Sequence, residues 1–409
     1  MRALGRAGPA ETRTGGASGS GGRDRGLARP RVVVVAEAFP MKGGIATFAE
    51  TIAADPGLRA AYEMELLNTA RTATRQGARL NLENVRQVLV DAWRTLRAAR
   101  RAGIVHLQLV ADPGLPALRA AALVLAGSAG RARLIAHVHS AVGNAGRPEF
   151  AAYGRLDRLA LRTLRRAALV CTVSNAGTRT MRAFAGRRPV RTVDNAVDVA
   201  AFQPTRADRV PPTVLFVGVI CRRKGLLELA RAGRLLNERG LTGWTLVVVG
   251  GQGPTPDAEY GEIVAEFQAA GLAASLVGPE ASDQVRARLA ESDIFVLPSY
   301  LEGQPMAIIE AMAAGVPVVG TAIGAVPDLI RDGTEGRVVE PGDVDQLAAA
   351  LDELIGDPAL RARMARAARR RAEEAHSLPR LSQRLADLYA EVLGRPAAVT
   401  ADPVEATSS

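Results

Sequence analysis

Short runs of β-branched and apolar residues alternate with longer amphipathic stretches along most of the chain. Five runs lie in the first half, at residues 31–36, 104–109, 133–138, 168–173 and 190–193. Five more lie at residues 213–218, 244–250, 274–278, 293–298 and 316–320. Apolar runs without alternation indicate strands buried on both faces, and the intervening stretches would form the covering helices. The pattern predicts an α/β protein with two doubly wound parallel sheets.

Residues 203–213, QPTRADRVPPT, separate the two series and are rich in proline and charge. We therefore predict a first domain at residues 31–203 and a second at 204–377. A last helix at 378–395 would pack back on the first domain. Residues 1–30 and 396–409 are predicted to be disordered tails. Two doubly wound domains would present the carboxyl ends of their strands to a shared cleft, where ligands bind.

Composition narrows the class of function. The net charge is +10, but aromatic residues make up only 4% of the chain. Nucleic-acid binding favours basic residues interleaved with aromatics, so we expect no nucleic acid as a partner. An anionic substrate or an anionic membrane surface fits the charge better.

The sequence also suggests where the protein works. Residues 1–30 lack the apolar stretch of a secretory signal, and the apolar residues 115–126 are too few to cross a bilayer. Cys171 and Cys221 stand apart from each other and from histidines, which argues against a disulfide framework or a zinc site. We expect a cytoplasmic protein, soluble or peripheral at the inner face of the cell membrane.

Two segments that follow predicted strands are candidates for phosphate binding. In EAFPMKGGIATF, residues 37–48, Gly43 and Gly44 would let the backbone approach an anion, although an ordinary turn uses glycine as readily. In FVGVICRRKG, residues 216–225, the cations Arg222, Arg223 and Lys224 precede a helix. Cations at a helix N-terminus oppose the macrodipole, so packing does not require them but a bound polyanion would.

Carboxylates mark a third segment, EGQPMAIIEAMAAGVPVV at residues 302–319. Glu302 precedes the predicted helix, and Glu310 lies inside it. Pro305 suits the first helical turn, and the amides of residues 304–307 would form an exposed N-terminus suited to a diphosphate. Because Glu302 has no basic neighbour one turn away, we predict a role in ligand binding.

Other patterns carry less information. In HVHS, residues 137–140, alternation places His137 and His139 on one side of a strand, whereas His106 and His376 are interpreted as structural. GGQG at 250–253 is a weak dinucleotide-binding pattern. DVD at 343–345 lies at a predicted helix start, where aspartate is a good cap. No cluster has metal-ligand spacing, so we predict neither a metal nor a cofactor.

Residues 32–393 resemble the large family of retaining GT-B glycosyltransferases known as family four, or group 1. The most specific part is residues 295–342, which include the two glutamates in E-x7-E spacing. FVGVICRRKG, TVSNAG at 172–177, DNAVDVAAFQP at 194–204, GGI at 43–45 and His139 resemble further segments. The resemblance implies two Rossmann-like domains that face a cleft.

The resemblance also implies roles for single residues. Lys224 with Arg222 or Arg223 would hold the diphosphate, Glu302 would bind the donor sugar, Glu310 the ribose, and His139 would lie near the reacting centre. The rest of the donor-binding set would be Gly43, Gly44, Gly218, Gly303, Gln304, Pro305, Met306 and Ala307. One position departs from the family, which often has arginine directly after the glycine of the phosphate segment. Here that residue is Val219.

The implied reaction is retaining, metal-independent transfer of a hexose-type sugar from a nucleotide diphosphate. A lipid-linked glycan for exopolysaccharide or cell-envelope synthesis is our hypothesis for the acceptor. Two alternatives stay open. One is another sugar-nucleotide enzyme of this architecture, such as an epimerase; a phosphorylase would usually need a pyridoxal lysine, and both lysines of the chain lie in predicted phosphate segments. The other is a non-catalytic sugar-nucleotide sensor, which the set Glu302, Glu310 and Lys224 disfavours.

Overall fold

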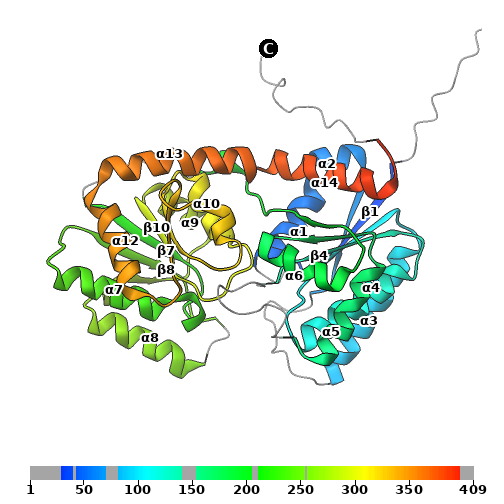
Figure 1. Cartoon of the computed structure of the whole chain (residues 1–409), viewed down its shortest axis with the longest axis horizontal. Coiled ribbons are helices and arrows are strands. Elements are labelled where there is room, and N and C mark those ends of the chain that lie inside the picture. The colour runs from blue at the N-terminus through cyan, green and yellow to red at the C-terminus, as the bar shows by residue number, and fades with distance from the viewer. Residues whose placement is uncertain are drawn as a thin grey trace, which may run out of the picture.

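The computed structural model describes residues 29–39, 43–70, 82–140, 153–204, 211–253 and 256–396. They form two α/β lobes side by side, each built on a six-stranded sheet (Figure 1). Every strand pairing in both sheets is parallel. The predicted fold class, two doubly wound Rossmann-like sheets, is confirmed. Residues 1–28, 40–42, 205–210 and 397–409, which belong to the predicted tails, glycine-rich segment and linker, lie outside the described residues.

The first lobe has the strand order β2-β1-β3-β4-β5-β6. The strands are β1 (Arg31–Ala36), β2 (Glu63–Asn68), β3 (Ile104–Leu109), β4 (Arg133–Val138), β5 (Leu169–Thr172) and β6 (Val190–Thr192). The helices are α1 (Gly44–Ala54), α2 (Pro56–Ala61), α3 (Leu82–Ala99), α4 (Leu115–Ser128), α5 (Arg155–Leu161) and α6 (Asn175–Ala185), with 3-10 turns at Arg162–Arg166 and Val199–Ala201. The strand order reverses between β1 and β3, so a ligand crevice is expected at their carboxyl ends.

The second lobe has the order β12-β11-β10-β7-β8-β9, which is the Rossmann order read from the other edge. Its strands are β7 (Thr213–Val217), β8 (Thr245–Val249), β9 (Leu276–Gly278), β10 (Ile294–Leu297), β11 (Val318–Thr321) and β12 (Gly336–Val339). Its helices are α7 (Leu226–Glu238), α8 (Asp257–Ala269), α9 (Ser282–Ala290), α10 (Met306–Ala313), α11 (Val326–Leu329), α12 (Val344–Gly356) and α13 (Pro358–Ala375), with 3-10 turns at Arg222–Lys224 and Ala273–Ser275. The reversal here falls between β7 and β10.

The last helix, α14 (Leu378–Leu393), extends from the end of α13 across to the first lobe (Figure 1). Its Leu385 and Tyr389 are buried in one core with Val32 and Val34 of β1. The alternate residues of β1, Val33 and Val35, belong to the core on the opposite face of the sheet. The C-terminal helix therefore covers one face of the N-terminal sheet and ties the two lobes together.

Two strands were not predicted, β2 and β12, and both lie at a sheet edge. Edge strands are only partly buried, so they need no continuous apolar run, and β2 reads EMELLN. Helix α5 begins at Arg155 and is short. It ends at Leu161 and continues as a 3-10 turn. Leu161 and Leu164 are both buried, and a 3-10 turn aligns residues three apart.

Candidate active site

The phosphate segment and the first glutamate meet at the switch point of the second sheet, because they follow β7 and β10. Gly225, between the 3-10 turn and α7, has φ of 72°, and a β-carbon there would lie 2.0 Å from Pro298 O. Only glycine permits this approach, which carries Lys224 to the end of β10. Tyr300 N donates to Arg223 O at 2.8 Å and joins the two loops.

Glu302 lies at the centre of this meeting point and is buried. Its Oε1 lies 2.5 Å from Lys224 Nζ and accepts a 2.9 Å hydrogen bond from Ser299 Oγ. Ser299 is itself buried, and its carbonyl accepts from Thr321 Oγ1 at the end of β11. The carboxylate lacked a basic neighbour in sequence, but its partner comes from a loop 78 residues away. Ser299 is a site residue that the sequence reasoning missed.

The two adjacent arginines point to different places. Arg223 Nη1 donates to Leu301 O at 2.8 Å and lies 3.9 Å from Glu302 Oε1. Arg222 instead forms an ion pair with Glu262 of α8, and its backbone N donates to Glu259 of the same helix. Arg223 therefore lies beside Glu302 and Lys224, whereas Arg222 is bound to the surface of α8.

Val219, in place of the family's arginine, is packed against the turn that follows β8. A β-carbon at Gly253 would lie 2.4 Å from Val219 Cγ1, and one at Gly250 would lie 1.8 Å from Gly218 O. The glycines of GGQG thus permit close packing on the end of β7. They have a structural reason to be there, in agreement with the weak match to a dinucleotide-binding pattern.

Helix α10 begins at Met306, with Pro305 as its N-cap, and Glu310 lies one turn further along. Burial raises the pKa of Glu310, and Arg286 opposes that effect only in part. No described side chain forms a hydrogen bond or ion pair with this carboxylate. Ala307 and Met306 occupy the first turn, where the backbone amides have no helical acceptor.

Gln304 connects the lobes. Its Oε1 accepts from Asn195 N at 2.5 Å, and its Nε2 donates to Asp194 Oδ1 at 2.9 Å. Asn195 Nδ2 donates in turn to Gln304 O at 3.1 Å. The predicted donor-binding residue therefore uses its side chain and carbonyl to hold the segment after β6, and its amide N is the group left for a ligand. This double contact could not be read from the sequence.

The glycine-rich turn of the first lobe faces the same place. A β-carbon at Gly44 would lie 3.4 Å from Met306 Cγ, so the beginnings of α1 and α10 are in contact. Gly43, with φ of 146°, is the residue before α1. In the same loop as Met306, a β-carbon at Gly303 would lie 2.8 Å from His139 O. Gly44 and His139 are thus brought up to the loop of Gly303–Met306, whereas Gly43 makes no such close approach.

His139 follows β4, and its Nε2 lies 2.7 Å from Oε1 of the buried Gln108. The rings of His137 and His139 lie 4.4 Å apart, so the two histidines share one side of the strand as predicted. Burial lowers the pKa of His139 to about 3, and the imidazole is neutral at physiological pH. His106 and His376 are both buried and bonded to Tyr389 and to Asn195 O, which agrees with their structural interpretation.

The remaining candidates behave as ordinary structure. Asp343 caps α12 by accepting from Gln346 N at 2.9 Å. Among the described residues, no group of three or more histidines, cysteines, aspartates and glutamates could hold a metal ion. No helix in the described part of the chain is long and apolar enough to cross a membrane.

Two family models match successive parts of the chain. Residues 43–201 match glycosyltransferase family 4, and residues 200–371 match glycosyl transferases group 1. Together they cover both lobes and every candidate residue of the cleft. The chain belongs to the group 1 glycosyltransferases.

Several named glycosyltransferases are similar to this chain over part of their length. An MMP alpha-(1->4)-mannosyltransferase of Mycolicibacterium hassiacum is 31% identical over 49% of this chain and 48% of its own. An alpha-D-kanosaminyltransferase of Streptomyces kanamyceticus is 33% identical over 44% and 46%. A putative colanic acid biosynthesis glycosyltransferase of Escherichia coli is 31% identical over 38% and 39%. The chain spans about half the length of the first two relatives.

Solved structures extend the likeness to the whole fold. Sucrose-phosphate synthase of Thermosynechococcus elongatus matches with a TM-score of 0.72 at 19% identity, over 90% of this chain and all of its own. HepE of Anabaena, solved in complex with UDP, matches with a TM-score of 0.68 at 17% identity, over 88% of this chain and all of its own. The GT-B architecture is confirmed by these neighbours.

Proposed function

We propose that this group 1 glycosyltransferase moves a sugar from a nucleotide diphosphate sugar to an acceptor, with retention of anomeric configuration and without a metal. The observation that carries the proposal is the meeting of Lys224, Arg223 and Glu302 at the switch point of the second sheet, beside the start of α10. Cations and helix amides suit a diphosphate, and the carboxylate suits sugar hydroxyls. HepE, whose fold is shared, was also solved in complex with UDP-glucose, which favours a donor of this class.

Charge development explains why these groups would act without a metal. The bond between the anomeric carbon and the diphosphate oxygen breaks with its electron pair on the leaving diphosphate. Lys224 and Arg223 would stabilise that charge, which is the largest kind of catalytic effect in such sites. The acceptor hydroxyl would attack from the face the diphosphate leaves and pass its proton to a diphosphate oxygen. No side chain then has to act as a nucleophile.

Each remaining candidate has a place in this scheme. Glu310 would accept from the ribose hydroxyls, which would supply hydrogen bonds that no described side chain gives its carboxylate. His139, neutral and held by Gln108, would donate to or accept from the sugar near the reacting carbon. Gly43, Gly44, Gly303, Pro305 and the amides of Gln304, Met306 and Ala307 would line the donor, and Gly218 would leave room at the end of β7. Arg222 would contribute least, because it is bound to Glu262.

We further propose that the acceptor is a lipid-linked glycan and that the protein works at the inner face of the cell membrane. The similarity to a putative colanic acid biosynthesis glycosyltransferase favours a role in polysaccharide synthesis. Residues 31–203 contain 25 lysines and arginines against 12 aspartates and glutamates, a net charge of +13, which favours an anionic surface.

The decisive experiment is a screen of nucleotide sugars by thermal shift, followed by turnover. The right donor at a hundred times its Kd should stabilise the protein by about 2.7 kcal/mol. Nuclear magnetic resonance of the product should then show the donor's anomeric configuration, and turnover should survive EDTA. An inverted product would overturn the retaining mechanism, and activity that returns only with magnesium or manganese would overturn metal independence. Binding without hydrolysis or transfer by any donor would instead identify a sensor.

A further inference from the structure

Helix α3 of the first lobe buries polar side chains while part of its apolar surface is exposed. The buried residues of α3 are Asp91, Thr95 and Ala99. The exposed residues include four large hydrophobic ones, Leu82 at 90%, Val85 at 44%, Leu89 at 66% and Trp93 at 55% exposure. These four recur every three or four residues and therefore share one face of the helix. A helix of a water-soluble lobe normally turns such a face to the core.

A polar network fixes this orientation. Asp91 is completely buried, accepts from Gln87 Nε2 at 2.9 Å and lies 3.4 Å from Arg119 Nη2 of α4. Arg119 also forms an ion pair with Glu37, after β1, at 3.1 Å. Rotating α3 to bury its apolar face would remove Asp91 from this network, and Arg119 would lose one of its partners. Breaking a buried ion pair costs free energy, because a charge is left without compensation. The apolar face is thus held outward by the fold.

Neighbouring helices expose apolar residues as well. Twelve large hydrophobic side chains are exposed in the described part of the chain, and eight of them belong to α3, α4 and α5. These three helices lie together on one side of the first lobe (Figure 1). On α5, Leu156 and Leu159 are exposed next to Arg155 and Arg162.

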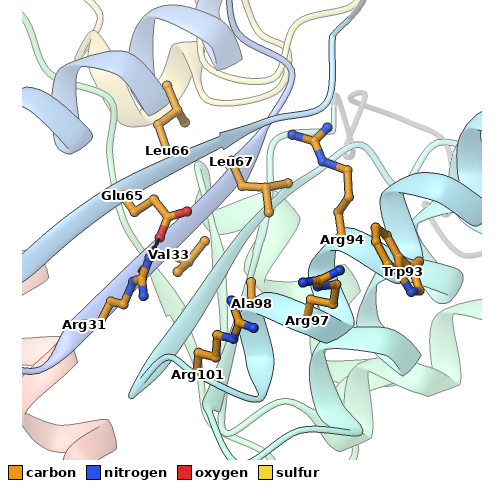
Figure 2. Close-up of a pocket in the computed structure, with 10 residues that line it drawn as sticks. All are labelled: Arg31, Val33, Glu65, Leu66, Leu67, Trp93, Arg94, Arg97, Ala98 and Arg101. Atoms are coloured by element: carbon orange, nitrogen blue, oxygen red, sulfur yellow. Dashed lines mark hydrogen bonds and ion pairs between the residues drawn. The ribbon is translucent and has the colours of Figure 1, made fainter.

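Beside the apolar face of α3 lies a groove lined by arginines. Figure 2 shows it between α3 and the strands β1 and β2, with a cavity of about 300 Å³. Its only carboxylate, Glu65, is bound by Arg31. Arg94, Arg97 and Arg101 form no ion pair with any described carboxylate, and the Arg97 guanidinium lies 4.7 Å from the centre of the Trp93 ring. The groove therefore carries three arginines without an ion pair to a described acidic side chain.

We propose that the outward face of α3, together with this groove, is a docking surface for a bilayer containing anionic phospholipids. Leu82, Val85, Leu89 and Trp93 enter the headgroup region, where a tryptophan ring is favoured, and the groove arginines bind lipid phosphates. Apolar residues flanked by unpaired arginines complement an anionic membrane better than they complement a protein partner. The inference rests on the proposed peripheral location but not on the sugar chemistry.

The surface is connected to the cleft by short contacts. Arg94 Nη1 donates to Asn68 O at 2.9 Å, at the end of β2. Asn68 Nδ2 donates in turn to Phe39 O at 2.6 Å. Phe39 is 72% exposed and precedes the glycine-rich segment that leads to Gly43 and α1. A hydrogen-bonded path thus joins Arg94 of the groove to Phe39, four residues before Gly43 in the sequence.

The test measures binding to vesicles without any nucleotide sugar. The full chain is sedimented with vesicles of phosphatidylcholine alone and of phosphatidylcholine mixed equally with phosphatidylglycerol. Binding is expected only to the mixture. Leu89→Ser with Trp93→Ser, and separately Arg97→Glu with Arg101→Glu, should each lower vesicle affinity by about tenfold or more. Arg363→Glu with Arg366→Glu, on the exposed side of α13, changes the net charge equally and should have little effect.

Fluorescence places the contact on α3. The chain has two tryptophans, so Trp244→Phe leaves Trp93 as the single reporter. Its emission should shift to shorter wavelength with the mixed vesicles and stay unchanged with phosphatidylcholine.

Three outcomes would overturn the inference. Absence of vesicle binding would remove both the surface and the peripheral location. Binding that the α3 variants do not weaken would keep the location but place it on another surface. A change of oligomeric state in these variants, with vesicle binding intact, would make the face a protein interface. Circular dichroism of each variant checks folding, and hydrolysis of a soluble nucleotide sugar, expected to be unchanged, separates this test from that of the cleft chemistry.

Discussion

At the scale of single residues, the ion pair of Glu302 with Lys224 is the feature on which the proposed catalysis depends most. In the structure the two charges satisfy each other, with the ammonium held at the end of β10. A donor would bring a diphosphate for Lys224 and hydroxyls for Glu302, so each group would exchange its partner for the ligand. The pair thus keeps both side chains in place before a donor binds.

Glu302→Gln should therefore reduce transfer far more than it reduces donor binding. The amide keeps the size and can still bond to sugar hydroxyls, but it cannot hold Lys224 by charge or stabilise an oxocarbenium-like centre. We expect kcat to fall by about 10²-fold or more, with donor Kd changed by less than about tenfold. Equal losses in turnover and binding would reduce Glu302 to a binding residue. Normal turnover would remove it from the active site.

The neighbouring arginines give a matched pair of variants. Arg223→Ala should lower kcat/KM by about 10²-fold or more, because this guanidinium lies beside Glu302 and would replace the cation that Val219 does not supply. Lys224→Ala should cost at least as much. Arg222→Ala removes the same charge from the same turn but breaks only its contact with Glu262, so we expect little change. Steady-state kinetics with the identified donor decide. If Arg222→Ala lowered kcat/KM strongly and Arg223→Ala did not, Arg222 would be the arginine that holds the diphosphate.

At the scale of elements, the sequence was most informative where burial is complete. Central strands such as β7 and β10 are continuous apolar runs and were predicted, whereas the edge strand β2 is half-polar and was not. Contacts between distant segments could not be predicted. The pattern of apolar and polar residues indicates whether a residue is buried, but it does not identify the residue that it contacts. Ser299 under Glu302 and Gln304 against Asn195 are of this kind. The burial of Asp91 in α3 likewise depends on Arg119 of another helix.

The histidines of β3 and β4 form a buried layer under α14. His106 Nδ1 lies 2.9 Å from Tyr389 Oη, and the rings of His106 and His137 are stacked 5.5 Å apart. Burial lowers the pKa of His106 and His139 to about 3 and holds that of His137 well below its ordinary value. In the unfolded chain these groups would titrate near pH 6.5. The folded layer therefore excludes protons that the unfolded chain binds.

This layer predicts a loss of stability in mild acid. Between about pH 6.5 and 3 the unfolded state binds more protons, so the free energy of unfolding falls as the pH falls, by up to about 1.4 kcal/mol per pH unit for each histidine. Urea unfolding at a series of pH values measures the slope. His106→Gln should make it shallower by about one histidine's share. Glu310 and Asp91, whose pKa values are raised by burial, act in the opposite direction but are the same in both proteins. An unchanged slope would mean that His106 is charged or hydrated in the fold.

At the scale of the whole molecule, the lobes are held together by a few polar contacts around the cleft and by α14. Besides the Gln304 contacts, Asp328 of α11 accepts from Asn175 N at 2.8 Å and from Asn175 Nδ2 at 2.9 Å, at the start of α6. The close approaches of Gly44 to Met306 and of Gly303 to His139 complete the junction. Together they describe a closed arrangement, in which residues from both lobes reach one site.

Asp328→Ala should shift the molecule toward an open form. It removes two hydrogen bonds between the lobes without touching the proposed donor residues. Each bond is exposed, so we expect a combined effect of about 1 kcal/mol on closure and at most roughly a fivefold weaker apparent donor affinity, because only the closed fraction binds with both lobes. Small-angle scattering without donor should show a larger radius of gyration, and saturating donor should restore the wild-type value. Asp283→Ala, an exposed aspartate of α9 without a described partner, removes the same charge and should change neither quantity. If Asp328→Ala leaves the radius and the affinity unchanged, closure is maintained by Gln304 and α14 alone.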